Sequence, residues 1–191
     1  HAEEIGKVSQ PIILGAEVSV ARQRELGLVI VGGGCSGTLI NRYWVLTASH
    51  CVSADGTEGG SDAPFKDTRV TANWTNKVAT PTRYVRYWAS NNLDVALIFL
   101  GAGDLGPVDR KLIYHGDVDS SMTMTKFGQG FCAYAAAGPP ATPARADCGY
   151  RSALLTPYSA TQTEIEFRPK PGSPAASFGD SGGPDYVTDG Y

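Results

Sequence analysis

The chain has 191 residues, and 16 lysine and arginine residues against 19 aspartate and glutamate residues give a net charge of −3. This near-neutral balance lacks the basic stripe that binds a phosphate backbone, so nucleic acid is excluded as an expected partner. The length suits one domain or two small halves joined tightly, and a hydrophobic share of 42% is enough for a sizeable core.

The apolar runs are short. Residues 95–100 form one of the longest, and this run is far below the ~20 residues needed to cross a bilayer, so we expect no membrane anchor. The sequence opens with His1 and has no basic start followed by a long apolar stretch. We therefore expect a processed, secreted chain from which any signal peptide has been removed.

Short runs of β-branched and aromatic residues, separated by turns, predict strands at 29–31, 37–40, 44–47, 95–100, 153–156 and 164–167. The 23 glycine and 12 proline residues favour many short strands joined by turns. No helical apolar period is sustained, and no repeat of about 20–50 residues is visible, so an all-β domain is expected. Residues 55–67 and 135–146 are expected to form loops.

The four cysteines fall into two pairs that are close in the sequence, Cys35 with Cys51 and Cys132 with Cys148. Three pairings are possible, and the short separation within each pair favours this one. Each disulfide would contribute on the order of 3 kcal/mol in the chain-entropy model, and disulfides imply an oxidising, extracellular compartment. A zinc site is not expected, because no C-x-x-C spacing is present and the histidines lie far apart.

Three segments carry residues suited to nucleophilic catalysis. They read TASHC at 47–51, LDVAL at 93–97 and GDSGGP at 179–184. A serine hydroxyl is a poor nucleophile at neutral pH and needs a base to accept its proton, and the base needs a carboxylate to orient it. His50, Asp94 and Ser181 supply these groups in the chain order His, Asp, Ser, which differs from the order in subtilisin and in the α/β-hydrolases.

In these three motifs, their order and their spacing, the sequence resembles the chymotrypsin-fold, trypsin-like serine endopeptidases over most of its length from about residue 12. The resemblance implies a single peptidase domain, 1–191, built from two antiparallel six-stranded β-barrels packed face to face. The barrels would span about 12–105 and 106–191, with the active site in the cleft between them. The resemblance also implies a protein or peptide substrate, and no metal or other cofactor.

By motif position, the resemblance makes His50 the general base, Asp94 the residue that orients it and Ser181 the nucleophile. The backbone amides of Gly179 and Ser181 would form the oxyanion hole, where a glycine leaves the amide facing the cleft with no side chain in the way. Each residue taken singly also has an ordinary structural interpretation: His50 as a satisfied core or surface residue, Asp94 as the start of a strand, and Ser181 as part of a turn.

The specificity pocket is expected at Ala175, Ala176 and Phe178, because in the family the residue six positions before the nucleophile lies at the base of that pocket. An acidic residue there would pair with arginine or lysine, and Ala175 cannot. We therefore expect a preference for apolar or aromatic rather than basic residues before the cleaved bond. Ser177 departs from many relatives, which carry a disulfide-forming cysteine there.

The family pattern continues beyond Tyr191 with strands that complete the second barrel. We expect a second polypeptide of a nicked form to complete the fold, and a truncated sequence is the alternative. Ile12 begins a partial match to the new amino terminus that, in many relatives, pairs with the aspartate before the nucleophile on activation, here Asp180. Pro11 is an awkward residue to cleave after, so a precursor form and another partner for Asp180 both stay open.

Two other functional classes stay open. A catalytically inactive homologue that serves as a binding or adaptor module would keep the fold but usually loses a member of the triad, whereas all three residues are present here. An esterase would share the serine, histidine and aspartate. Labelling of Ser181 by an organophosphonate separates the inactive homologue from the two hydrolases, and turnover of peptides against simple esters separates the hydrolases.

Overall fold

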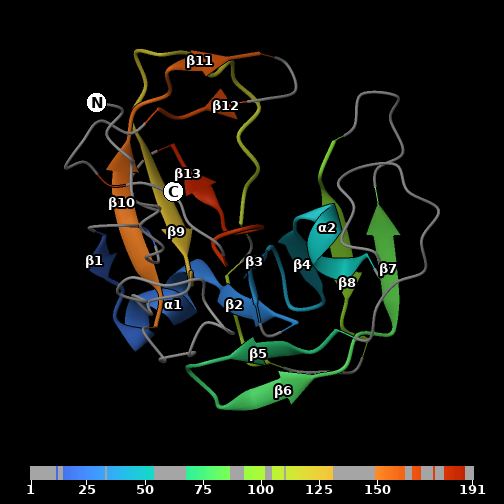
Figure 1. The fold of residues 1–191 in the computed structure, drawn as a ribbon. Helices are drawn as coiled ribbons and strands as arrows, with labels where there is room; N and C mark the ends of the chain where they lie inside the picture. Colours follow the sequence, from blue (N-terminus) through green and yellow to red (C-terminus); the bar gives the residue numbers. More distant parts are fainter. Residues whose placement is uncertain are drawn as a thin grey trace, which may run out of the picture.

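The computed structural model of the protein describes residues 12, 15–32, 34–53, 68–86, 93–101, 105–109, 111–130, 149–161, 165–168, 174 and 179–187. These residues form two main β-sheets, a small hairpin and two short helices (Figure 1), which confirms the all-β fold class. Neither helix in these ranges combines the length and the apolar character that a membrane span requires. The loops expected at 55–67 and 135–146 lie outside the described residues.

The larger sheet has seven strands in the order β6-β5-β2-β3-β4-β8-β7, with antiparallel neighbours throughout. Its strands are β2 (Leu28–Val31), β3 (Cys35–Leu39), β4 (Trp44–Thr47), β5 (Val70–Ala72), β6 (Lys77–Ala79), β7 (Arg83–Arg86) and β8 (Ala96–Phe99). The sheet curls, with β5 and β6 below β2 and with β7 and β8 beyond β4 (Figure 1). Buried side chains such as Val29, Val45 and Ile98 form one hydrophobic cluster within it.

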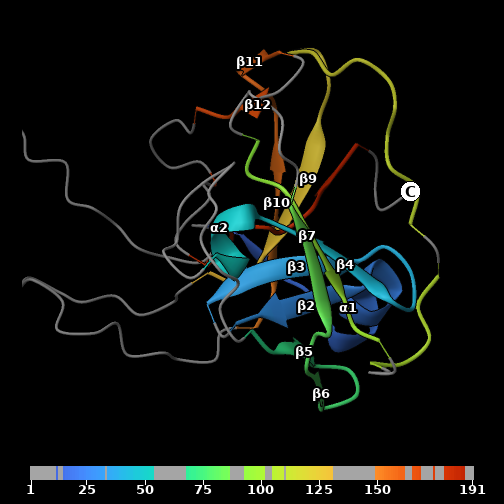
Figure 2. The same cartoon turned by 90° about the vertical axis from the view of Figure 1, so that its right-hand side faces the viewer.

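The smaller sheet has four antiparallel strands in the order β1-β10-β9-β13. They are β1 (Ala16–Glu17), β9 (Met124–Gly128), β10 (Arg151–Leu155) and β13 (Asp185–Tyr186), and a separate hairpin joins β11 (Ser159–Ala160) to β12 (Ile165–Glu166). β9 and β10 stand on the side of β2 and β3 away from β5 and β6 in both views (Figures 1 and 2). This curled sheet and its smaller partner fit the expected pair of β-barrels.

Every strand that the sequence predicts has a counterpart among the described residues, and the described ends agree to within two residues. The position of β1 differs from the expected one, because the expected division assigned residues from about 12 onward to the first barrel. β1 pairs with β10 of the smaller sheet, and Val18, which follows β1, packs with Phe127 and Tyr150. The start of the described chain is therefore held by the smaller sheet.

Two short helices interrupt the strands. In α1 (Val20–Leu26), the Ser19 side chain accepts a hydrogen bond from the Arg22 backbone and caps the first turn, and Gly27 ends the helix in the left-handed conformation at φ 68°. The single turn α2 (Ser49–Val52) follows β4 directly and carries His50. Both are too short to give the sustained apolar period of a longer helix.

A second hydrophobic cluster joins α1 to the smaller sheet. Phe127 and Tyr186 meet edge to face with ring centroids 5.6 Å apart, and Leu26 packs against them with Val18. The Tyr186 hydroxyl donates to the backbone oxygen of Leu26 over 3.0 Å. Burial raises the pKa of Tyr186 to about 12, so this hydroxyl keeps its proton and its hydrogen bond at neutral pH.

Candidate active site

Pairing of β4 with β8 brings His50 and Asp94 together from positions 44 residues apart in the chain. Thr47 at the end of β4 lies opposite Ala96 at the start of β8. His50 follows Thr47 within α2, and Asp94 precedes Ala96, so both side chains extend from the same end of the strand pair.

Asp94 holds His50 through two hydrogen bonds. Nδ1 of the imidazole lies 2.6 Å from Asp94 Oδ2, and the His50 backbone N–H donates to Asp94 Oδ1 over 2.9 Å. A carboxylate can only accept here, so this pattern assigns the proton to Nδ1 and leaves Nε2 as the basic nitrogen. The His50 and Asp94 side chains are 25% and 28% exposed, so the pair is only partly screened by solvent.

Asp94 is a carboxylate at neutral pH. Burial by itself would raise the pKa of the Asp94 carboxyl, but the hydrogen bonds from the side chain and backbone of His50 outweigh burial and hold this pKa below its usual range. A charged carboxylate beside Nδ1 orients the imidazole and stabilises a proton arriving on Nε2.

The backbone of Ser181 lies close to His50 and the strand β3. Its carbonyl oxygen accepts a hydrogen bond from Ser36 N over 2.8 Å. Cys51 Sγ lies 3.8 Å from this oxygen and 3.6 Å from His50 Nε2, so one sulfur touches both candidate residues. Among the described residues, no hydrogen bond joins the Ser181 hydroxyl to His50. Catalytic hydrogen bonds are often formed fully only with substrate bound.

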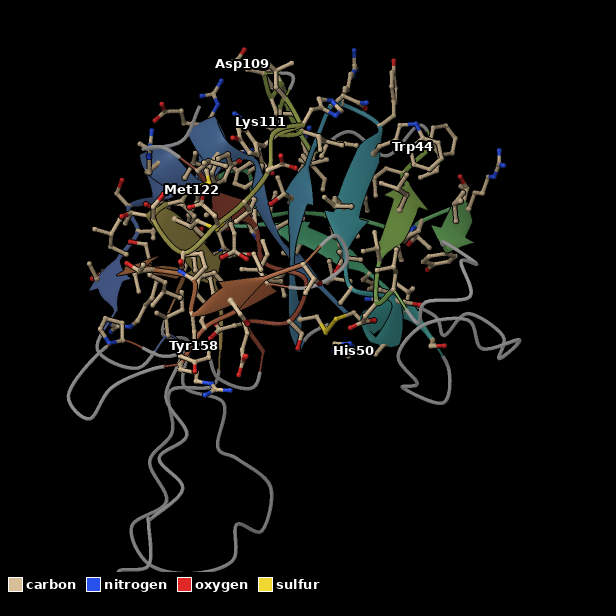
Figure 3. All side chains as sticks on the ribbon, turned by 90° about the horizontal axis from the view of Figure 1, so that it is seen from above. Trp44, His50, Asp109, Lys111, Met122 and Tyr158 are labelled. Carbon is tan, nitrogen blue, oxygen red and sulfur yellow. A yellow bond between two sulfur atoms is a disulfide. The ribbon has the colours of Figure 1, made fainter. Side chains whose placement is uncertain are left out.

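Cys35 and Cys51, one of the two expected pairs, form a disulfide with an S–S distance of 2.05 Å. It ties β3 to α2, and Figure 3 shows the yellow bond beside His50, on the side of the molecule opposite Asp109 and Lys111. The two sulfurs and the imidazole lie within 4.8 Å of one another. A disulfide offers no thiolate to a metal, so this group of atoms is not a metal site.

The backbone amides of Gly179 and Ser181 have no hydrogen-bond acceptor in the part of the chain that the structure describes. Gly179 is buried and adopts φ 94°, a conformation that favours glycine. Most buried amides find an acceptor within the protein or in water. Two amides that are two residues apart and have no acceptor among the described residues can donate to an oxygen of a bound molecule.

Asp180, between these residues, is almost fully buried at 2% exposure. Its Oδ2 accepts a hydrogen bond from the backbone nitrogen of Ile12 over 3.1 Å, and Ile12 is itself completely buried. The structure therefore places the Asp180 carboxylate beside Ile12, the residue suggested as its partner in the sequence analysis. In this chain, Ile12 N belongs to the peptide bond that follows Pro11.

Other expected site residues lie outside the described residues. These are Ala175, Ala176 and Phe178 of the specificity pocket, Ser177 beside them, and the pair Cys132 and Cys148.

The sequence did not identify Ser36 as a site residue. Its side chain is completely buried and joins the segment before Ser181 to the end of β9. The signal that could have identified Ser36 is a polar residue within a strand, next to a disulfide cysteine.

A family model described as Trypsin matches residues 12–191. The snake venom serine protease of Crotalus durissus durissus is 47% identical over 51 residues, which are 26% of this chain and 20% of that protein. The snake venom serine protease catroxase-1 of Crotalus atrox is 54% identical over 46 residues, 24% of this chain and 18% of that protein. The matched segments thus span about a fifth of the length of these curated relatives.

A similar solved structure is neuropsin, a serine protease expressed in the limbic system of mouse brain. Its TM-score is 0.65 at 17% sequence identity, and the alignment covers 93% of this chain and 82% of that chain. This likeness shows a shared fold. Together with the family match over nearly the whole sequence, it leads to one conclusion: the chain belongs to the trypsin family.

Proposed function

We propose that this chain is a serine endopeptidase in which Ser181 is the nucleophile, His50 the general base and Asp94 the residue that orients the base. The double hydrogen bond between His50 and Asp94 carries the proposal. It holds an imidazole with Nε2 as the basic nitrogen, which is the group that a serine nucleophile requires. The Cys51 sulfur lies close to both the Ser181 carbonyl oxygen and His50 Nε2, and this proximity adds support.

In the proposed reaction, Ser181 Oγ bonds to the carbonyl carbon of the substrate and passes its proton to His50 Nε2. The carbonyl oxygen takes the negative charge, and the amides of Gly179 and Ser181 donate hydrogen bonds to it. His50 then gives the proton to the leaving nitrogen as the C–N bond breaks, which leaves an acyl group on Ser181. Water repeats the two steps and releases the acid.

The substrate is proposed to be a protein or peptide with an apolar or aromatic residue before the cleaved bond. Ala175 at the expected base of the pocket supplies no carboxylate to pair with arginine or lysine. Secretion is supported by the Cys35–Cys51 disulfide, since disulfides persist in oxidising compartments, and by the similarity to proteases of snake venom.

We also propose that the chain divides into its two barrels near residue 105, with β1 near its start joining the second barrel. The strands of the seven-stranded sheet lie between Leu28 and Phe99, whereas β9 to β13 all follow residue 123. The segment between Leu105 and Met124 then connects the two halves.

Labelling with an organophosphonate tests the nucleophile and base directly. Wild-type protein should carry the adduct on Ser181, located by peptide mass spectrometry. Ser181→Ala should abolish the label, and His50→Ala should slow labelling strongly because no base accepts the serine proton. His115→Ala is the matched control, since His115 is exposed and has no proposed role.

The outcomes separate the proposal from its alternatives. No adduct on folded wild-type protein contradicts a serine hydrolase and favours an inactive binding module. Labelling with turnover of simple esters but not of peptides favours an esterase. Cleavage after arginine or lysine in a peptide library would contradict the proposed pocket alone.

A further inference from the structure

Ser36 lies where the two sheets meet. It is the second residue of β3, next to the disulfide at Cys35, and is completely buried. Its hydroxyl donates to the backbone oxygen of Gly179 over 2.9 Å and accepts from the backbone nitrogen of Gln129 over 2.8 Å. One side chain on the larger sheet therefore binds two separate segments next to the smaller sheet.

The backbone of Ser36 adds two more contacts. Its nitrogen donates to Ser181 O over 2.8 Å, and its oxygen accepts from the Thr47 hydroxyl over 2.8 Å. Thr47 ends β4, three residues before His50. Ser36 thus connects the segment that carries Ser181 with the strand that leads to His50.

These bonds fix the peptide groups on both sides of the Ser181 amide. The side chain of Ser36 holds the carbonyl of Gly179, and its backbone nitrogen holds the carbonyl of Ser181. The peptide group between the two carries the Ser181 N–H, and it is restricted because both of its neighbours are anchored. The Gly179 N–H belongs to the peptide group directly before the first anchored one.

We propose that Ser36 is a positioning residue whose hydroxyl holds the amides of Gly179 and Ser181 in the direction needed to bind the reaction's oxyanion. This role rests on the proposed peptidase function. Donors of this kind act because they are aimed at the developing charge before the reaction begins. Loss of the hydroxyl leaves the Ser181 bond to the Ser36 backbone intact and releases Gly179 O together with Gln129 N, so the hydroxyl can be tested separately from the backbone contact.

Ser36→Ala and the control Thr38→Val form a matched pair. Thr38 lies two residues along the same strand, so it is on the same face, and it is 4% exposed. Its Oγ1 is buried and has no hydrogen-bond partner in the described structure. Both variants therefore remove a buried hydroxyl from β3, but only Ser36→Ala removes one that is bound to the Ser181 segment.

Steady-state cleavage of an apolar peptide substrate should show a loss of roughly 10–100-fold in kcat for Ser36→Ala with KM unchanged. A peptide aldehyde, which forms a tetrahedral adduct with an oxyanion, should bind more weakly by the same factor. Thr38→Val should keep kcat and aldehyde affinity within about twofold of the wild type. Thermal unfolding of each variant, with assays run well below its midpoint, ensures that folded proteins are compared.

Wild-type kcat in folded Ser36→Ala, or an equal loss in Thr38→Val, overturns the role of Ser36. A rise in KM without a change in kcat also overturns it, because that pattern reports substrate binding rather than oxyanion stabilisation. If Ser36→Ala does not fold, Ser36→Gly replaces it and should show a kcat loss in the same direction, whereas full activity overturns the proposal. A wild-type protein that neither cleaves peptides nor takes the phosphonate overturns the proposed function and this role together.

Discussion

Gly182→Ala should destabilise the protein through two separate penalties. Gly182 has φ 77°, and this left-handed conformation costs a residue with a Cβ about 1–2 kcal/mol. A Cβ built at Gly182 would also lie 2.5 Å from Ser36 O and 2.7 Å from Ala48 N, both backbone atoms that cannot move aside easily. Overpacking of this kind costs about 1–3 kcal/mol.

The expected loss in the free energy of unfolding is about 1–5 kcal/mol, with a central value near 3 kcal/mol, after subtracting about 0.4–1 kcal/mol that alanine gains by restricting the unfolded chain. Two other glycines separate the penalties. Gly149 has φ 65°, and no heavy atom of the described residues lies within 4 Å of the position that a Cβ would take, so Gly149→Ala reports backbone strain. Gly34 has neither a positive φ nor such a close atom among the described residues, so Gly34→Ala should be neutral or slightly stabilising.

Urea unfolding and thermal unfolding, both followed by tryptophan fluorescence, would rank the three variants, in a Ser181→Ala background that prevents self-digestion. Gly182→Ala should lower the thermal midpoint by about 5–15 °C, and Gly149→Ala by a few degrees. Equal unfolding free energies for Gly182→Ala and Gly149→Ala would refute the close approach of the Ser181 segment to β3 and α2.

Four other predictions follow from single groups. Ser49→Ala should raise the free energy of unfolding by up to about 1 kcal/mol, because Ser49 Oγ is buried without a partner in the described structure; a lower melting temperature would contradict this. Tyr186→Phe should lower the free energy of unfolding by about 1 kcal/mol in the same assay, since it removes the bond to Leu26 O. The pKa of Asp94 is lower in the folded chain, so its stabilising contribution is fully present above the unfolded value of about 3.9 and is lost as pH falls through the folded value. The stability advantage of the wild type over Asp94→Asn, measured by denaturant unfolding at several pH values, should therefore shrink in acid. Peptidase activity should rise as pH passes about 6–7, where an ordinary imidazole loses its proton, and a flat rate from about pH 5 to 8 would contradict a histidine base.

Three of the strands that the sequence predicted share one property. β2, β4 and β8 contain runs of large apolar residues, such as Leu28–Val31, and such runs identify a strand buried in a core. The strands β5, β6 and β7 are short and carry exposed residues such as Lys77 and Arg83, so their apolar signal is too weak to detect. They exist because they pair with a strand already in place, which is a tertiary effect that local pattern does not contain.

For the candidate site, sequence reasoning could find groups with distinctive chemistry. His50 and Asp94 were found from their residue types and from the motifs of the resemblance, and the Cys35–Cys51 pair from its short separation. The structure brings all four residues into one region. Ser36 was not found, because a serine acquires a role only through the atoms that surround it. Its partners Gly179 and Gln129 are 143 and 93 residues away in the chain, and no local pattern encodes contacts at that range.

The base pair of the proposed triad, His50 with Asp94, and its nucleophile, Ser181, are held by different parts of the fold. His50 and Asp94 both extend from the larger sheet, so pairing of β4 with β8 is sufficient to form their hydrogen bonds. Ser181 comes from the segment that leads into β13 of the smaller sheet, and its contacts with Ser36 and Cys51 exist only where the two sheets meet. A shift of one sheet against the other would therefore leave the base oriented and move the nucleophile. The contacts that Ser36 makes across this junction resist such a shift.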